Sequence, residues 1–311
     1  MKLAIQHLSK RYPNGVQALD DVSLSIPTGM FGLLGPNGAG KSTLMRTIAT
    51  LQEADSGSIL LEGIGPDQDT GGRLDVLKDK AEVRKILGYL PQDFGVYPKV
   101  TAEDLLDHLA TLKGIVPARD RRAVVASLLR KTNLYDVRRQ RLGSFSGGMK
   151  QRFGIAQALL GNPSIIIVDE PTAGLDPEER VRFHNLLSEI GQQVIVILST
   201  HIVDDVTDLC QQMAIIHRGR VVASGEPSRL AADLEGRIWQ KTITKDELAQ
   251  LESEVMVLST RLRAGRLVVH VCCESAPDAS FVPIEPELAD VYFRAIKDRA
   301  DLVGAVDQVA S

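Results

Sequence analysis

The chain contains Gly35-Pro36-Asn37-Gly38-Ala39-Gly40-Lys41-Ser42-Thr43, which matches the pattern G-x-x-x-x-G-K-[ST]. An apolar segment, residues 30–34, precedes it, and a helical pattern follows it to about residue 50. The predicted order of strand, glycine loop and helix is the context that this pattern needs. Glycines let backbone N–H groups close around a phosphate, and the helix directs its positive end at the anion. We therefore expect this phosphate loop to bind a nucleotide.

A second segment ends in two adjacent carboxylates. It reads Ile165-Ile166-Ile167-Val168-Asp169-Glu170, and such a continuous apolar run is typical of a strand buried on both faces of a parallel sheet. Open α/β sheets bind ligands at the carboxyl ends of their strands. Asp169 is therefore placed to hold Mg²⁺, and Glu170 to polarise the water that attacks the γ-phosphate. Lys41 would neutralise the β- and γ-phosphates, and Ser42 would ligate the metal.

A third motif lies shortly before these carboxylates. It reads Phe145-Ser146-Gly147-Gly148-Met149-Lys150-Gln151-Arg152 and opens a helix predicted to run to residue 160. Alone, Ser-Gly-Gly is an ordinary helix N-cap. Between the phosphate loop and the two carboxylates, it resembles the signature motif of ATP-binding-cassette (ABC) ATPases. The chain departs from that motif at Met149, where Gln is commoner in the family.

The remaining motifs of that family are present in order. Tyr12 resembles the aromatic residue that stacks on adenine, and Gln92 resembles the glutamine of the Q-loop. Asp176, in Gly174-Leu175-Asp176-Pro177, resembles the D-loop aspartate, and His201 resembles the switch histidine. Each would be an ordinary loop or cap residue in isolation. Six motifs in one order are hard to obtain by chance, so together they support the resemblance. It covers residues 1 to about 235.

The resemblance implies ATP and Mg²⁺ as the bound groups. It assigns catalysis to Glu170, His201 and Gln92, and the metal to Ser42, Gln92 and Asp169. In ABC ATPases two cassettes face head to tail, and the phosphate loop of one and the signature of the other enclose each ATP. We therefore expect a second, identical cassette as a partner. The ATP-binding set is Tyr12, Gly35, Pro36, Asn37, Gly38, Ala39, Gly40, Lys41, Ser42, Thr43, Ser146, Gly147, Gly148 and Asp176.

The resemblance also implies the fold, an α/β P-loop NTPase of the ABC cassette type. We expect residues 1–235 to form this domain, with a mixed sheet core, an antiparallel β edge from residues 3–8 and 22–26, and a helical subdomain at about 92–160. Two helical patterns, residues 102–112 and 123–134, support that subdomain. The polar stretch 62–82, longer than usual for the family, is predicted to be a surface loop.

A small accessory domain is predicted for residues 236–311. The pattern there changes to alternating segments, 237–244, 255–263 and 266–272, and ends in a helix near 286–296. We therefore expect an α+β unit.

Composition limits the partners. The 36 Lys and Arg against 40 Asp and Glu give a formal charge of -4, so no overall basicity favours a nucleic-acid partner. The three cysteines cannot form a disulfide framework, which favours a reducing cytosol. No secretory signal is visible at the N-terminus, and no apolar stretch approaches the roughly 20 residues of a membrane-spanning helix. A membrane role must therefore come from a partner.

The resemblance implies an ATPase that couples dimer closure to a separate integral membrane permease at the cytoplasmic face of the cell membrane. One cassette followed by a small domain is similar to drug-resistance-type ATPases of the type-2 ABC exporters, as are the strings at residues 87–95 and 286–292. We therefore expect an exporter. An importer ATPase with a regulatory tail stays open, as does a soluble ABC ATPase acting on ribosomes or DNA. The cargo is not encoded in these motifs, since the membrane subunit selects it.

Overall fold

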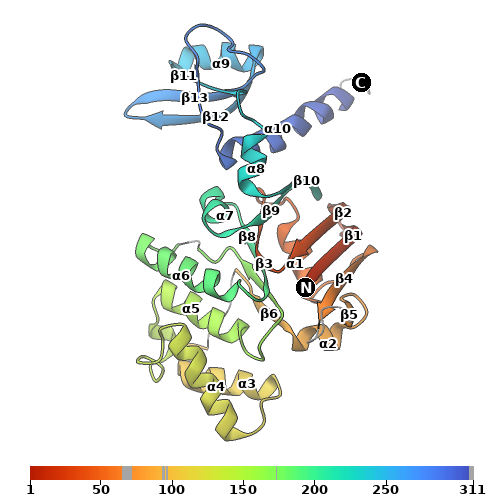
Figure 1. The fold of residues 1–311 in the computed structure, drawn as a ribbon, viewed down its shortest axis with the longest axis vertical. Coiled ribbons are helices and arrows are strands. Elements are labelled where there is room, and N and C mark those ends of the chain that lie inside the picture. Colours follow the sequence, from red (N-terminus) through yellow and green to blue (C-terminus); the bar gives the residue numbers. More distant parts are fainter. Residues whose placement is uncertain (65–71, 93–94, 96, 173, 308–311) are drawn as a thin grey trace.

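The computed structural model describes residues 1–64, 72–92, 95, 97–172 and 174–307, of which 298–307 are described as backbone alone. A large body and a small C-terminal body follow one another along the long axis (Figure 1). Helices α8 (Pro227–Ala232) and α10 (Leu288–Asp307) lie where the two bodies meet. The mixed sheet, the antiparallel sheet and the helical group of the large body confirm the predicted α/β fold class.

The central sheet has the strand order β10-β9-β3-β8-β7-β6. All neighbours in it are parallel except β9 and β10. Every residue of β7 and β8 is buried, because helices cover one face while helix α1 (Lys41–Ile48) and the antiparallel sheet cover the other. The strands are β3 (Gly29–Leu34), β6 (Leu87–Leu90), β7 (Ile165–Asp169), β8 (Ile195–Thr200), β9 (Gln212–His217) and β10 (Arg220–Gly225).

The antiparallel sheet has the order β2-β1-β4-β5 and includes part of the stretch predicted to be a loop. Its strands are β1 (Lys2–Arg11), β2 (Gln17–Pro27), β4 (Ser56–Ile64) and β5 (Gly72–Asp75). The prediction of a loop over 62–82 is wrong for residues 62–64 at the end of β4, for β5 and for the start of helix α2 (Lys80–Lys85). Leu74 pairs with Leu61, and Val76 and Val83 are fully buried, so a few apolar residues among the charges determine the structure. Residues 65–71 lie outside the described chain.

A helical group forms the far end of the large body (Figure 1). Its core is separate from the cores on the two faces of the central sheet, because Leu106, Leu129 and Phe153 pack together among their own neighbours. Helix α4 begins five residues before the predicted start, since the basic turn ahead of residue 123 is also helical. The group contains α3 (Ala102–Leu112), α4 (Ala118–Lys131), the 3₁₀ turn η1 (Leu142–Ser144) and α5 (Gly147–Ala158).

The C-terminal body is an antiparallel sheet of order β12-β13-β11-β14 with one helix that the sequence analysis did not assign. None of the residues of that helix, α9 (Lys245–Glu254), is buried. A capping box between Thr244 and Glu247 marks its start. The strands are β11 (Ile238–Ile243), β12 (Met256–Arg263), β13 (Arg266–Cys272) and β14 (Val282–Pro283).

The two bodies share apolar packing. Leu258, Leu288 and Tyr292 of the C-terminal body belong to the same buried cluster as Leu198 and Val206 of the large body. Helices α6 (Pro177–Ile190), α7 (Val203–Leu209) and α10 contribute to this cluster. The domain boundary at 235/236 stays a prediction, because the change of sheet there is not a change of core.

Candidate nucleotide site

Four strands of the central sheet end at one edge. The parallel register aligns the end of β3 with β8, β8 with β7, and β7 with β6. The segments that follow these ends are the phosphate loop (residues 35–43), His201, Glu170 and Gln92. The fold therefore gathers four predicted motifs at one sheet edge, although they are widely separated along the chain.

Gly40 sets the conformation of the phosphate loop. It is the N-cap of α1 at φ 109°, a left-handed conformation that favours glycine. A Cβ at this position would lie 2.4 Å from the carbonyl oxygen of Ala18, so no side chain fits. The loop thereby turns directly into α1, whose first-turn N–H groups and positive dipole end can bind an anion.

Lys41 is held in place by the loop itself. Its Nζ donates hydrogen bonds to the carbonyl oxygens of Gly35 at 2.6 Å and Pro36 at 3.2 Å. Glu170 Oε1 lies 3.7 Å from the same Nζ. Burial lowers the pKa of Lys41, while the negative charges of Glu170 and Asp169 oppose that shift. A buried cation bonded mainly to neutral carbonyls is well placed to exchange them for phosphate oxygens.

Glu170 and His201 form a hydrogen-bonded pair. Glu170 follows β7 at φ 49°, a conformation that costs energy for a residue other than glycine, and its N–H donates to Ser199 O at 2.9 Å. Its Oε2 lies 2.6 Å from His201 Nδ1. The Glu170 side chain is only 7% exposed, whereas that of His201 is 52% exposed. The turn therefore fixes a buried carboxylate behind an accessible imidazole, an arrangement suited to moving a proton.

Asp169 has the properties expected of a magnesium ligand. Its Oδ1 is buried and has no hydrogen-bond partner among the described residues. Burial raises its pKa, with a further contribution from Glu170, against lowering by Ser199, Lys41 and Arg46. Nowhere in the described chain do three His, Cys, Asp or Glu side chains form a metal-binding group. This composition fits Mg²⁺, which commonly takes one or two protein ligands, substrate phosphates and water.

Two further residues near Asp169 were missed by the sequence analysis. Asp169 interacts electrostatically with Arg46 of α1 and with Tyr89 of β6. Burial raises the pKa of Tyr89, and Asp169 adds to that shift. Arg46 lies four residues after Ser42 and therefore on the same face of α1. That spacing is the one signal in the sequence that could have identified it.

Tyr12 and Gln92 lie at the periphery of this edge. Tyr12 is half-buried, and its hydroxyl lies 3.2 Å from Thr43 Oγ1 and 3.0 Å from Gln52 Oε1. It therefore contacts the phosphate loop through Thr43. Gln92 is exposed two residues after β6, where its side chain can reach outward from the sheet edge. Their roles as adenine platform and metal sensor stay predictions.

The signature segment (Ser146, Gly147, Gly148) is held by helices rather than by the phosphate loop. Ser146 caps α5 by accepting a hydrogen bond from Met149 N at 3.2 Å. A Cβ on Gly148 would lie 2.5 Å from Glu179 Oε2 of α6, whereas one on Gly147 would meet nothing within 4 Å. Asp176 caps α6, at 2.8 Å from Glu179 N.

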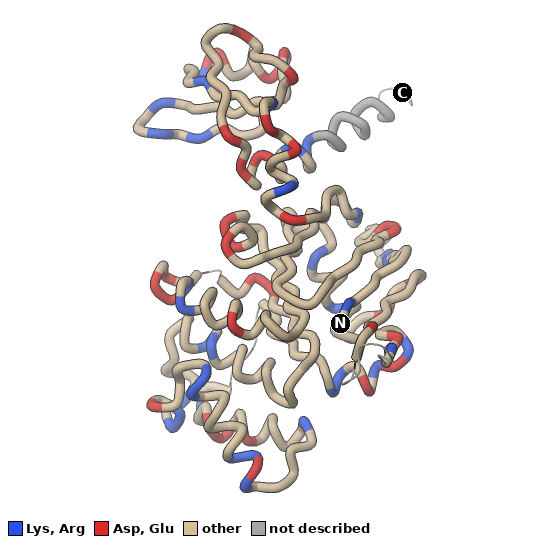
Figure 2. Tube along the Cα trace, in the orientation of Figure 1, with Lys and Arg blue, Asp and Glu red and all other residues tan. Residues whose placement is uncertain are grey.

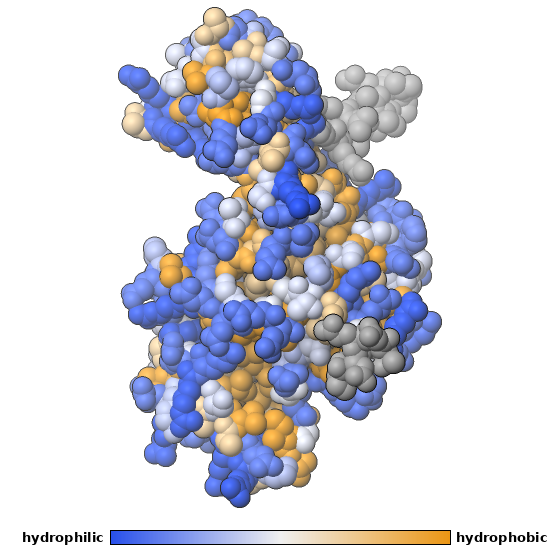
Figure 3. All heavy atoms as spheres, viewed as in Figure 1, coloured by the Kyte–Doolittle hydropathy of each residue, from blue (hydrophilic) through white to orange (hydrophobic). Residues whose placement is uncertain are grey.

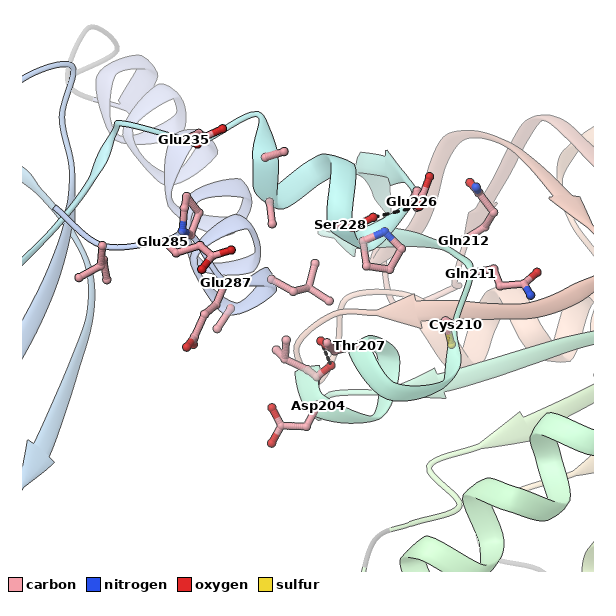
Figure 4. Close-up of a pocket in the computed structure, with 18 of the residues that line it drawn as sticks. Asp204, Thr207, Cys210, Gln211, Gln212, Glu226, Ser228, Glu235, Glu285 and Glu287 are labelled. Carbon is pink, nitrogen blue, oxygen red and sulfur yellow. Dashed lines mark hydrogen bonds between the residues drawn. The ribbon is translucent and has the colours of Figure 1, made fainter.

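A cavity lies between the two bodies. This cleft, of about 1370 Å³, has acidic residues on both sides (Figure 4). Asp204 and Glu226 line it from the large body, and Glu285 and Glu287 from the segment before α10. It contains none of the predicted nucleotide-binding residues. The cleft is therefore distinct from the nucleotide site.

Within the described chain, no helix combines the length and apolarity needed to cross a membrane. Lys and Arg are interspersed with Asp and Glu over the visible trace (Figure 2). The expectation that nucleic acid is not a partner stays a prediction.

Comparison with known proteins gives consistent matches. A profile of the family described as ABC transporter matches residues 19–173. YxlF of Bacillus subtilis, an uncharacterized ABC transporter ATP-binding protein, is 30% identical over 94% of this chain and 99% of its own length. YbhF of Escherichia coli, a probable multidrug ABC transporter ATP-binding protein, is 32% identical over 77% of this chain, which matches only 40% of YbhF.

Two further matches are a relative that is named as an import protein and a solved structure. The methionine import ATP-binding protein MetN 2 of Yersinia pestis is 37% identical over 76% of this chain and 72% of its own. A solved structure of the ATP-binding subunit of an ABC transporter superposes with a TM-score of 0.63 at 29% identity, covering 75% of this chain and 93% of that one.

Proposed function

Because the chain belongs to the family of ABC transporter ATP-binding proteins, we propose that it is the ATP-hydrolysing motor of a membrane exporter whose permease is a separate protein. The observation that supports hydrolysis most directly is the buried Glu170 carboxylate, 2.6 Å from His201 and 3.7 Å from Lys41. One carboxylate between a proton carrier and a phosphate-binding cation suits attack by water on a γ-phosphate.

Each residue at the sheet edge has a separate task in this proposal. Lys41 leaves the loop carbonyls and neutralises the phosphates, while the N–H groups of the phosphate loop hold them in place. Ser42 and Asp169 would hold Mg²⁺, which would supply positive charge close to the phosphates. Glu170 orients the water, and His201 holds Glu170 through Nδ1 and presents its other ring edge outward. Positioning and charge neutralisation then supply most of the rate.

Gly147 supports the proposal of a head-to-tail dimer. Within the described chain a Cβ on Gly147 would meet nothing within 4 Å, so no intramolecular contact accounts for a glycine there. Close approach of a phosphate from a second chain would account for it. In this arrangement Ser146 and Gly147 of one chain complete the site that Lys41 of the other begins, and Asp176 lies beside the contact.

Exposed apolar residues of the helical group support a permease contact. Tyr97, Leu112 and Val116 are exposed there, and hydrophobic side chains gather on the same end of the molecule in Figure 3. We expect a coupling helix of the permease to dock near residues 94–106, of which 94 and 96 lie outside the described chain. Apolar side chains that gather on one surface are suited to receive the apolar face of a partner's helix.

The direction of transport rests on resemblance. YbhF is named as a probable multidrug protein, which favours the exporter type. YxlF, whose similarity extends through the C-terminal body, is uncharacterized and gives no direction. The match to MetN 2, a methionine import protein, supports an importer ATPase as the second candidate. The closing motion and hydrolysis would be the same in either case.

Purification of the tagged Glu170→Gln protein from its native membrane with ATP and Mg²⁺ tests this function. We expect a polytopic membrane protein to co-purify in near-equal amount, because the variant stays in the ATP-bound closed state. Lys41→Ala is the matched control, since it should not bind ATP and should lose the ATP-dependent part of the capture. Capture of ribosomal or DNA-repair proteins without a membrane protein would contradict the transport role.

A further inference from the structure

Asp205 is a charged residue in an unusual position. It lies on α7 and is fully buried, and both of its carboxylate oxygens are hydrogen bonded. None of the motifs singled out in the sequence includes it. A buried carboxylate of this kind stays in a fold only when its partners offset the cost of removing it from water.

One oxygen of Asp205 bonds to the two segments that carry the catalytic pair. Thr172 Oγ1 donates to Oδ2 at 2.6 Å, and Thr200 Oγ1 donates to the same oxygen at 3.3 Å. Thr172 lies two residues after Glu170, and Thr200 immediately precedes His201. A single oxygen therefore ties the chain on both sides of the Glu170–His201 hydrogen bond.

The other oxygen bonds to α6. Arg180 Nε lies 2.9 Å and His184 Nε2 lies 2.9 Å from Oδ1. Asp176 is the N-cap of helix α6, and Glu179 of this helix lies against Gly148 of the signature segment. Through Asp205, the catalytic pair is therefore joined to the helix that supports the proposed contact with a second chain.

These partners also keep the carboxylate charged. Burial alone would raise the pKa of Asp205, but hydrogen bonds from His184 and Thr172, together with the charge of Arg180, bring it below its usual value. Both carboxylate oxygens of Asp205 have hydrogen-bond partners, and such fully bonded networks hold their members in one geometry.

We propose that Asp205 is a positioning residue for ATP hydrolysis, which fixes Glu170 and His201 relative to each other and to α6. It is fully buried and acts only through Thr172, Thr200 and α6. The inference rests on the proposed ATPase but not on transport. A displacement of the order of 1 Å at a catalytic group costs roughly 100-fold in rate, so loss of this tie should be visible in turnover.

The test measures ATP turnover by the full chain without any permease. Asp205→Asn keeps the shape but removes the charge, and we expect kcat to fall by at least about tenfold while KM for ATP stays within about twofold. Asp204→Asn is the matched control, because it makes the same change at the next, exposed position of α7. It should leave kcat unchanged.

Thr172 provides a second, independent pair of variants in case Asp205→Asn folds poorly. Thr172→Val removes the hydroxyl at constant shape and should lower kcat, whereas Thr172→Ser retains the donor and should restore it. Wild-type kcat in both Asp205→Asn and Thr172→Val would overturn the inference. A rise in KM with unchanged kcat would do the same, because it would indicate a role in binding. Neither result bears on the permease, which the co-purification decides separately.

Discussion

Two of the histidine–carboxylate pairs in the described chain, His201–Glu170 and His270–Asp290, are chemically alike and differently placed. In the large body, His201 Nδ1 lies 2.6 Å from Glu170 Oε2, with the imidazole 52% exposed. In the C-terminal body, His270 Nδ1 lies 3.0 Å from Asp290 Oδ1, with side chains only 6% and 1% exposed. The pair in the C-terminal body joins β13 to the first turn of α10. The first pair lies at an open sheet edge, and the second is enclosed.

The two pairs also differ in the hydrogen bonding of the carboxylates in and beside them. Asp290 Oδ2 accepts a hydrogen bond from Glu287 N at 2.9 Å, so both of its oxygens are bonded. Beside Glu170, by contrast, Asp169 Oδ1 is buried without a partner in the described chain, and Glu170 itself has a strained backbone. Unsatisfied acceptors and strain indicate a site built for a ligand, whereas a closed set of bonds indicates a structural clamp.

The largest effect expected from this comparison is on turnover by Glu170→Gln. The amide keeps the size of the side chain but cannot accept a proton, so kcat should fall by about 10²- to 10⁴-fold. ATP affinity should stay near the wild-type value, as measured by equilibrium binding. An unchanged rate of hydrolysis would remove Glu170 from the mechanism and leave the two pairs without a functional difference.

The second expected effect is on stability and comes from the enclosed pair. His270→Phe would leave Asp290 Oδ1 buried without its partner, and this should lower the free energy of unfolding by about 3 kcal/mol in urea. The kcat of the folded protein should stay within about twofold of wild type. If turnover fell while stability did not, the C-terminal pair would be functional and the contrast would fail.

The sequence predicts those candidate site residues that belong to a local motif. It does not predict residues that only the packing of distant segments brings together. The phosphate loop, Asp169 and Glu170 are adjacent to strands whose apolar runs are plain in the sequence. Asp205 could not be identified in this way, because its partners come from three other segments and meet only in the folded chain. A cap motif was the only local sign of α9, and a few apolar residues among charges the only sign of β5 and α2.

A third, smaller effect tests the idea that an unsatisfied acceptor marks the ligand site. Asp169→Asn removes a buried charge that lacks a partner at Oδ1, so the nucleotide-free chain should gain about 1 kcal/mol, or about 2 °C in Tm. Because burial raises the pKa of Asp169, its charge destabilises the folded chain above that pKa. The gain should therefore be present at pH 7 and shrink at acidic pH, where the wild-type carboxyl is protonated.

The same variant should lose Mg²⁺-dependent hydrolysis. Calorimetry across pH, with turnover measured at several Mg²⁺ concentrations, separates the two effects. A variant that is less stable than wild type at pH 7 and equally responsive to Mg²⁺ would show that the orphaned oxygen is not reserved for a metal.

The smallest expected effect concerns Tyr12. Its hydroxyl is hydrogen bonded within the protein, while its ring is predicted to stack on adenine. Tyr12→Phe removes the bonds to Thr43 and Gln52 but keeps the ring, so KM for ATP should change by no more than about twofold while stability falls by about 1 kcal/mol. Tyr12→Ala removes the ring, and loss of stacking worth about 1–3 kcal/mol should raise KM at least about fivefold. Equal KM values in the two variants would mean that Tyr12 is a structural clamp like His270. A selective loss in Tyr12→Ala would show that one side chain combines both roles, because its edge is bonded to the fold while its face remains available to adenine.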